Sequence, residues 1–411
     1  MRYRKVSSVA DISGDVSVVM DFIGVDEYRQ SLSRIHRSLN SKGFVTPYDD
    51  AAFALELDLL NIEMLRVECG GAFRIFPGKC HAGVDFLIGL GQTIPVLSTG
   101  AKTRLLGRIK KGFDEGLWPV QHELRVTANL SKNGWDISFH DLEFDGGYDF
   151  LATKDGRTFE VEAKAISAYT GWPIKPDNLA KLQIEVKEHF DCFDDILTPI
   201  VGVTLPSNLP ADRTHLQQLV SQINSVVRNE NDDSNSLGDF QYMGKVPLTS
   251  PGSVMLAARM RALRTKNPVL FRPVHPRLIL ELASRRPNQL ARKTIRTINE
   301  AGRVQFSGSN PGVIWTHMNF MSKEVFRSLS TSQHGMTCLF DGIANAVFRS
   351  EKRSHISQLC FTGGSFLDRT DETARSSSLS AIYNSPACRF GKDVLFTGGR
   401  MKKSNEKTEH N

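Results

Sequence analysis

Asp149, Glu162 and Lys164 are residue types that hold a metal ion and orient water, and they lie on two short segments separated by Asp155-Gly156. Apolar and polar side chains alternate along both segments, which is typical of strands with one buried face. Asp-Gly favours a tight hairpin turn between such strands. Counting back from this turn predicts that Asp149 faces Glu162, with Lys164 beyond Glu162 on the same face.

Two carboxylates at facing positions repel each other, because their Cβ atoms lie roughly 4.5–5.5 Å apart in such a hairpin. A divalent cation between Asp149 and Glu162 would offset the repulsion, since Mg²⁺ binds to one or two carboxylates together with water and phosphate oxygens. Lys164 would then orient or polarise a metal-bound water. The alternative is a solvated strand face, in which the register slips by one residue and the carboxylates are separated.

A further acid, Glu123, belongs to a predicted helix from Pro119 to Lys132, which Asn133-Gly134 ends. At about 100° per residue, Glu123 falls within the mainly apolar arc of this helix. Burial of an unpaired carboxylate is costly. Glu123 therefore joins the same metal cluster, keeps its proton, or bends out to solvent near the helix start.

The elements around the hairpin follow one another in a definite order. A predicted strand, residues 135–140, precedes the hairpin, and a predicted helix that Asp177 caps follows it. Gln183 lies within the apolar stripe of that helix. The mostly apolar run from Ile196 to Leu205 has the length of a buried strand. The order is helix, three strands, helix, strand.

This order, with Glu123 on the first helix, Asp149 on the second strand and Glu162-Ala163-Lys164 on the third, resembles the PD-(D/E)xK nuclease superfamily over about residues 115–205. Within it, the chain is most similar to Mrr-like restriction endonucleases and archaeal Holliday-junction resolvases. The resemblance implies an αβββαβ core of the restriction-endonuclease type, a DNA substrate, and a role in restriction or genome defence.

The resemblance also implies roles for individual residues. Asp149 and Glu162 would bind Mg²⁺, with Mn²⁺ able to substitute, while Lys164 would position the attacking water and Glu123 would be the accessory acid. Tyr148 stands where the name-giving proline would be, and Glu160 adds an acid of unassigned role. Some relatives carry a glutamine on the helix after the lysine, which would map to Gln183; a polar residue at a helix edge is the alternative.

Basic residues are concentrated in one stretch, although the net charge of the 411-residue chain is only +6. Residues 251–300 contain eleven Arg and Lys side chains against two Glu, whereas residues 181–240 contain four basic and ten acidic side chains. Concentrated Arg and Lys are suited to phosphate backbones, because neutralising phosphates releases counterions. The predicted DNA contacts are Arg285, Arg286, Arg292 and Lys293. Alternatively, these side chains form a solvated basic surface that balances the charge of the acidic stretch within the fold.

Composition favours a soluble intracellular protein, expected in the cytoplasm, and the length suggests two or three domains. The order of the elements indicates an α/β protein. Apolar residues make up 40% of the chain, which suffices for a sizeable core. No apolar run reaches the ~18 residues of a membrane span, so we expect no membrane partner. The six cysteines show no zinc-site spacing and are expected to be reduced. Nothing in the pattern indicates a homo-oligomer.

The predicted domain boundaries lie at stretches rich in Gly, Pro and polar residues. They are an N-terminal part of unassigned role (1–105), a nuclease-like core (106–228), a linker or long loop (229–250), a C-terminal α/β domain with the basic segment (251–400) and a disordered tail (401–411). Glycines at 83, 89 and 91 lack a phosphate-loop pattern, which argues against nucleotide binding.

Two functions from different classes are compatible with this pattern. One is a metal-dependent endonuclease that hydrolyses phosphodiester bonds in DNA. The other is a non-catalytic DNA-binding or assembly protein with a degenerate nuclease fold. A purely structural module is the weaker third hypothesis, and cutting of plasmid with Mg²⁺ against EDTA separates the first two.

Overall fold

The computed structural model describes residues 9–41, 54–69, 81–144, 146–167, 170–190, 197–247, 269–271, 278–319, 323–330, 338–363, 379–391, 394–395 and 400–401. The chain divides into two compact units. Unit 1 consists of Met1–Ile35, Phe53–Thr170 and Leu290–Asn411, and unit 2 consists of His36–Ala52 and Gly171–Gln289. Both units combine helices with a mixed sheet, so the predicted α/β class is confirmed.

Unit 1 is built on a seven-stranded sheet. Its strands, in spatial order, are β1 (Asp136–Phe139), β2 (Phe150–Lys154), β3 (Arg157–Ser167), β9 (Gly312–Asn319), β10 (Ile356–Gly363), β11 (Leu379–Asn384) and β12 (Arg400–Met401). The three central strands β3, β9 and β10 are parallel. On one side, β1 and β2 run antiparallel to their neighbours, and on the other, β11 runs antiparallel to β10 and parallel to β12.

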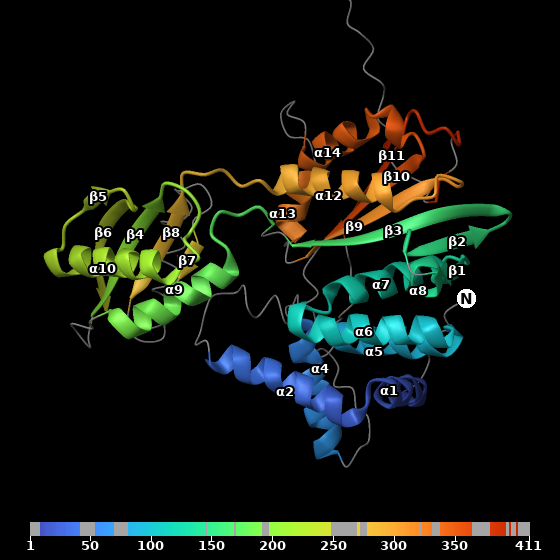
Figure 1. Cartoon of the computed structure of the whole chain (residues 1–411), viewed down its shortest axis with the longest axis horizontal. Helices are drawn as coiled ribbons and strands as arrows, with labels where there is room; N and C mark the ends of the chain where they lie inside the picture. Colours follow the sequence, from blue (N-terminus) through green and yellow to red (C-terminus); the bar gives the residue numbers. More distant parts are fainter. Residues whose placement is uncertain are drawn as a thin grey trace, which may run out of the picture. The chain divides into compact units, whose positions relative to one another are not determined.

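Helices cover both faces of this sheet (Figure 1). On one face lies α7 (Trp118–Lys132), where the ring of His122 stacks on His317 of β9 at a centroid distance of 5.4 Å. On the other face, α12 (Leu290–Val304), α13 (Lys323–Ser330) and α14 (Leu339–Phe348) pack in one apolar cluster with Ile166, Ile314 and Met318. Side chains alternate along β3, so Glu162 and Lys164 point to the face opposite to Val161 and Ala163.

The N-terminal helices of unit 1 support α7. They are α1 (Val9–Ile23), α2 (Val25–Ser41), α4 (Ala54–Glu68), α5 (His81–Thr93), the short 3-10 helix η1 (Ile94–Val96) and α6 (Thr99–Glu115). Gly91 lets α5 approach α1, because a Cβ there would lie 2.6 Å from the Cα of Asp15. This glycine serves helix packing, in keeping with the absence of a phosphate-loop pattern. The predicted boundary at residue 105 falls inside α6, so the predicted N-terminal part is not a separate compact unit.

Unit 2 has a five-stranded sheet of its own. In spatial order its strands are β5 (Asp233–Asn235), β6 (Gly238–Pro247), β4 (Leu197–Leu205), β8 (Ile279–Ser284) and β7 (Val269–Phe271). Its helices α9 (Pro176–His189) and α10 (Arg213–Asn229) pack against each other, and α10 contacts β4 and β6 (Figure 1). The predicted linker 229–250 contains β5 and β6, because its polar residues form a hairpin.

The chain connectivity corrects one expectation about the core. The elements α9 and β4 exist where the sequence predicts them, but β4 pairs with β6 and β8 in unit 2. The parallel neighbour of β3 is β9, which the chain reaches through α12. The order helix, three strands, helix, strand is therefore completed in unit 1 by α12 and β9, and unit 2 is inserted between β3 and α12.

Beyond residue 311, the structure contains β9, α13, α14 and β10, with a 3-10 helix, η2 (Glu351–Arg353), before β10. The helix α9 begins at Pro176 after Lys175, so Asp177 lies in its first turn instead of capping it. The predicted tail beyond residue 401 and most of the basic stretch 251–277 lie outside the described residues. Within the described part of the chain, no helix has both the length and the apolar character needed to cross a membrane.

Candidate active site

The β2–β3 hairpin has the register that the sequence predicts. Asp155 and Gly156 have φ values of 50° and 74°, which is the backbone of a tight primed turn. Phe150 pairs with Val161 and Lys154 with Arg157. The position preceding Phe150 therefore faces the one following Val161, which places Asp149 opposite Glu162 and excludes the slipped register.

Asp149 is fixed by its own hydrogen bonds at the start of β2. Gly146 and Gly147, with φ values of 131° and 88°, form the turn that leads into it, a backbone that side-chain-bearing residues rarely adopt. The backbone oxygen of Asp149 accepts from the N–H of His140 at 2.9 Å, and its side-chain Oδ2 accepts from the N–H of Ala163 at 2.6 Å. Asp149 is buried, so its carboxylate is tied directly to the strand that carries Glu162 and Lys164.

Glu162 and Lys164 form an ion pair between Oε1 and Nζ. The side chain of Lys164 is partly exposed, whereas Glu162 is 1% exposed. The second carboxylate oxygen of Glu162, Oε2, is buried and has no hydrogen-bond partner among the described residues. A buried carboxylate oxygen without a partner is costly, and a bound cation would remove that cost.

Glu123 turns toward the hairpin. Its Oε2 lies 3.2 Å from Nη1 of Arg108 on α6, and the other guanidinium nitrogen of Arg108 bonds to Asp141. Asp141 is buried in α8 (His140–Phe144), between β1 and β2, and its Oδ1 has no partner within the described residues. Arg108 and Asp141 were not predicted from the sequence, although an acid directly after a strand and before Gly146-Gly147 is a usable signal for Asp141.

The position of α8 is set by α6. Arg104 on α6 donates from Nε to the backbone oxygen of Leu142 at 2.6 Å and from Nη2 to that of Glu143 at 3.0 Å. Ser98, which caps α6, donates from its backbone N–H to the Glu143 carboxylate at 3.1 Å, and its hydroxyl binds the same group. Ser98 and Arg104, from the predicted N-terminal part, thus hold α8 and with it Asp141 in place. The next turn of α6 supplies Arg108.

Three carboxyl groups of this site, those of Glu123, Asp149 and Glu162, have raised pKa values. Burial, followed by repulsion from Glu123 and Glu162, raises the pKa of Asp149 well above its ordinary value. Burial also raises the pKa of Glu162, and the nearby ammonium of Lys164 offsets only part of this effect. The pKa of Glu123 rises to about 8, because burial and the charges of Asp141 and Glu162 outweigh the contact with Arg108. Burial disfavours the charged form of Lys164, but attraction to Glu162 and Asp149 prevails and raises its pKa.

The charge balance of the site fits a divalent cation. Four carboxylates and two cations interact electrostatically here, namely Glu123, Asp141, Asp149 and Glu162 with Arg108 and Lys164. When all are ionised, two negative charges are left over, the amount that one divalent cation neutralises. Hard oxygen ligands are what Mg²⁺ selects, and the partnerless oxygens of Glu162 and Asp141 are available as ligands or as acceptors for metal-bound water.

Another acidic group in the described residues meets a simple distance criterion for a metal. Glu185, Glu188 and His189 of α9 offer ligand atoms within 4.8 Å of one another, whereas three oxygens of the unit 1 site do not approach this closely. However, Arg213 already lies 2.8 Å from Glu185 and 2.6 Å from Glu188. Arg213 therefore offsets one of the two carboxylate charges in the unit 2 cluster.

The metal-free protein is expected to lose stability as the pH rises from about 4.5 to about 8. The ordinary pKa of Glu123 is 4.5 and its pKa in the folded protein is about 8, so over this range the folded state binds a proton that the unfolded state has released. Rising pH then favours unfolding. Thermal melting in EDTA across this range tests the trend. A Glu123→Gln protein should show a flatter profile, and an unchanged profile would contradict the assignment.

Glu160, the extra acid of the hairpin, has a structural role. It is completely buried, and Ser307 donates to it from its backbone N–H, at 2.9 Å, and from its hydroxyl. Asn310 donates from its backbone and side-chain nitrogens, both at 3.3 Å. These bonds fix the loop between α12 and β9, so Glu160 positions the strand beside the site and is not available to a metal.

Replacing Glu160 with Ala should destabilise the protein by about 2 kcal/mol, since the change removes the acceptor of the part-buried hydrogen bonds from Ser307 and Asn310. Urea unfolding in EDTA measures this loss. The matched control is Glu115→Ala, which removes a carboxylate that is 66% exposed and should change stability little. Equal midpoints for the two variants would show that the Glu160 bonds do not hold the loop.

Two further residues of the resemblance lie outside the chemistry. Tyr148 is buried with its ring centroid 4.1 Å from that of His140, so it packs the turn before Asp149. Gln183 is buried on α9, which belongs to unit 2.

The predicted DNA-contacting residues are divided between the units. Arg292 and Lys293 are exposed on α12 in unit 1, whereas Arg285 and Arg286 are exposed at the end of β8 in unit 2. Arg285 donates from Nη2 to Asp239 at 2.6 Å. Arg285 therefore forms an ion pair with the acidic stretch, as the alternative to DNA contact predicts for this residue.

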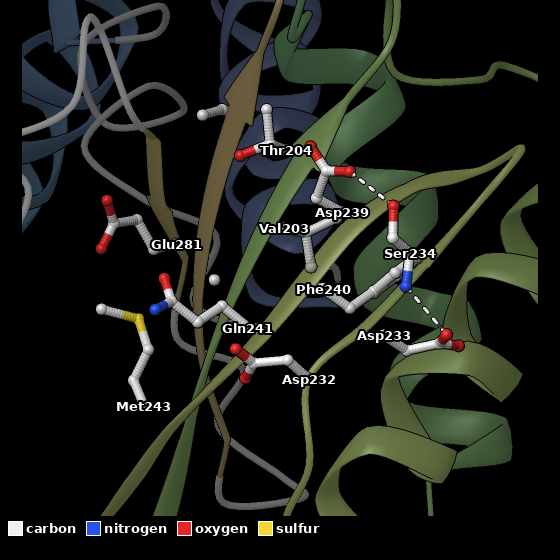
Figure 2. A pocket seen from close by; sticks show the side chains of 12 residues that line it. Val203, Thr204, Asp232, Asp233, Ser234, Asp239, Phe240, Gln241, Met243 and Glu281 are labelled. Atoms are coloured by element: carbon white, nitrogen blue, oxygen red, sulfur yellow. Dashed lines mark hydrogen bonds between the residues drawn. The ribbon is translucent and has the colours of Figure 1, made fainter.

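A hollow of about 840 Å³ lies on the sheet of unit 2 (Figure 2). Its lining is acidic, with Asp232, Asp239 and Glu281 among the side chains. Figure 2 shows the Ser234 hydroxyl bonded to Asp239, and Asp232 accepts from the N–H of Tyr242 at 2.8 Å. Because these carboxylates are already engaged, the unit 1 cluster remains the stronger candidate for metal chemistry.

Comparison of the chain with protein-family models, with curated proteins and with solved structures finds no match. The geometry of the chain's own residues therefore carries the functional argument.

Proposed function

We propose that the chain is a metal-dependent nuclease that hydrolyses phosphodiester bonds in DNA, with its active site in unit 1. The observation that carries the proposal is the buried cluster of Asp149, Glu162 and Lys164 on one hairpin, in which Glu162 Oε2 has no partner among the described residues. Its excess negative charge fits one divalent cation.

Asp149 and Glu162 would hold Mg²⁺, whose chemistry is to make a bound water nucleophilic and to stabilise charge at the scissile phosphate. Lys164, which contacts Glu162, would orient the water and place a positive charge beside the phosphate. Glu123 would be the accessory acid, and a bound cation would lower its pKa from the value of about 8 in the metal-free protein. Arg108 would hold Glu123 and Asp141 in place as a positioning residue.

Incubation with supercoiled plasmid tests the proposal. Nicked or linear DNA should appear with Mg²⁺ or Mn²⁺ and should be absent with EDTA. Cutting that EDTA does not stop would exclude a metal-dependent reaction, and intact plasmid with both metals would exclude a nuclease acting on this DNA.

A specific observation supports the second candidate, a non-catalytic DNA-binding or assembly protein. Both cations of the site are already engaged, Lys164 with Glu162 and Arg108 with Glu123 and Asp141. In a degenerate site, such ion pairs would offset the carboxylate charges in place of a metal. DNA retention that falls with salt, without cutting under either metal, would favour this candidate.

A further inference from the structure

A basic hollow of about 560 Å³ lies in unit 1 between α12 and η2. Its lining contains five basic side chains and one acid, namely Arg292, Arg296, Arg303, Lys352 and Arg353 with Glu300. Among the described residues, none of the five basic side chains forms an ion pair with a carboxylate. This sets them apart from Arg285 and Arg213, which are paired within unit 2.

The pattern of α12 explains why the charges gather on one side. At about 100° per residue, Arg292, Arg296 and Arg303 fall within an arc of about 40° on the helix surface. The buried residues Leu290 and Ile298 fall on the other side of the helix, which faces the apolar cluster. At about 1.5 Å rise per residue the basic stripe is roughly 16 Å long.

A close approach of two segments completes the hollow. A Cβ on Gly302 would lie 2.6 Å from Cδ1 of Ile356, so the glycine lets β10 and the preceding η2 approach α12. His355 shares a hydrogen bond with the backbone oxygen of Gly302 at 2.9 Å. This contact places Lys352 and Arg353 beside the arginine stripe.

The hollow also contains polar atoms that lack partners. Nη1 of Arg353 and Oδ1 of Asn299 are buried and have no hydrogen-bond partner among the described residues. Burial lowers the pKa of Arg353 from its ordinary value, as expected for a guanidinium that no anion compensates. A buried guanidinium nitrogen in a hollow that four other basic side chains also line is suited to an anion that supplies oxygen acceptors.

We infer that the hollow between α12 and η2 is a binding site for the phosphate backbone of duplex DNA, separate from the metal cluster. The stripe is long enough to contact more than one phosphate of a strand, since successive phosphates advance about 3.4 Å along the axis. Backbone contacts of this type position a protein on DNA without reading bases. The inference rests on the proposed function in its choice of DNA as ligand.

The test is binding of a labelled duplex in EDTA, where no cleavage occurs, at several salt concentrations. The triple variant Arg296→Glu, Arg303→Glu, Lys352→Glu should bind at least about tenfold more weakly than the unaltered protein. It should also lose about 2.7 from the slope of log K against log salt, since each lost phosphate contact contributes about 0.9. The three side chains are exposed, so the fold should be kept, which circular dichroism and melting will check.

The matched control changes the same amount of charge elsewhere. Lys111, Lys132 and Lys187 are exposed and lie outside the hollow, and their joint replacement with Glu should leave the slope nearly unchanged. Equal slopes for the unaltered protein and the hollow variant would overturn the inference, as would an equal loss in the control. Displacement of the duplex by inorganic phosphate beyond its ionic-strength effect would also overturn it, by assigning the hollow to small phosphate ligands.

The outcome is distinguishable from failure of the nuclease proposal. If the unaltered protein binds duplex through the hollow but never cuts plasmid, the DNA-binding inference is supported and the nuclease proposal is rejected. If plasmid is cut and the hollow variant binds with the original salt slope, the nuclease proposal is supported and the DNA-binding inference is rejected.

Discussion

Asp149→Asn, Glu162→Gln and Lys164→Ala are each expected to lower Mg²⁺-dependent cleavage of plasmid by about 10²–10³-fold or more. The first two remove a charge that would hold the metal, and the third removes the charge beside the water and the phosphate. Amide replacements suit the two buried carboxylates, because they keep the size of the side chain. Initial cleavage rates at saturating DNA measure the effect.

Asp155→Asn is the matched control for this series. It makes the same carboxylate-to-amide change in the same hairpin, and asparagine tolerates the positive φ of 50° found at Asp155. Its cleavage rate should equal that of the unaltered protein. Cleavage by Lys164→Ala at the original rate would remove the proposed mechanism even if the carboxylate variants were inactive.

Asp149→Asn is also expected to stabilise the protein in metal-free buffer by roughly 1 kcal/mol, the size of one pKa unit of altered interaction. The amide removes a charge that is buried and repelled by Glu123 and Glu162, and its oxygen can still accept from the N–H of Ala163. With Mg²⁺ the ranking should reverse. Mg²⁺ at a concentration of about 100 times Kd raises the free energy of unfolding of the unaltered protein by about 2.7 kcal/mol. The variant should be stabilised little by Mg²⁺.

Melting curves of both proteins in EDTA and in Mg²⁺ check this reversal, with Asp155→Asn again as the control that keeps the full gain from Mg²⁺. If Asp149→Asn gains as much from Mg²⁺ as the unaltered protein does, then Asp149 does not hold the ion. If it is less stable than the unaltered protein in EDTA, the bond to Ala163 outweighs the repulsion and the charge argument is wrong.

The hairpin could be predicted because its information is local. The turn at Asp155-Gly156 sets the register within a few residues, and the alternation along each strand assigns the faces. The same local patterns predict α7 and place Glu123 toward the interior. For these residues, the described structure and the sequence agree.

Strand partners and the remaining site residues could not be predicted in this way. An apolar strand such as β4 has the same pattern whether it lies beside β3 or in a second sheet, so its position after α9 suggested the wrong neighbour. Arg108 has no sequence signal, since it reaches Glu123 and Asp141 only through the packing of α6 on α7 and α8. Such residues depend on tertiary contacts, which periodicity does not encode.

The insertion of unit 2 has a consequence for the order of folding. The N–H of Gln289 donates to the backbone oxygen of Gly171 at 3.1 Å, so the two ends of the inserted segment meet within unit 2 itself. Pairing of β3 with β9 across an unfolded insert would cost about 4 kcal/mol in loop-closure entropy, because that cost grows with the logarithm of loop length. Once unit 2 has folded, a much shorter stretch of chain remains to be closed, and roughly 1.5 kcal/mol of this cost is removed. Unit 2 is therefore expected to fold before the central sheet of unit 1, so the β2–β3 hairpin forms early and its pairing with β9 follows the folding of unit 2.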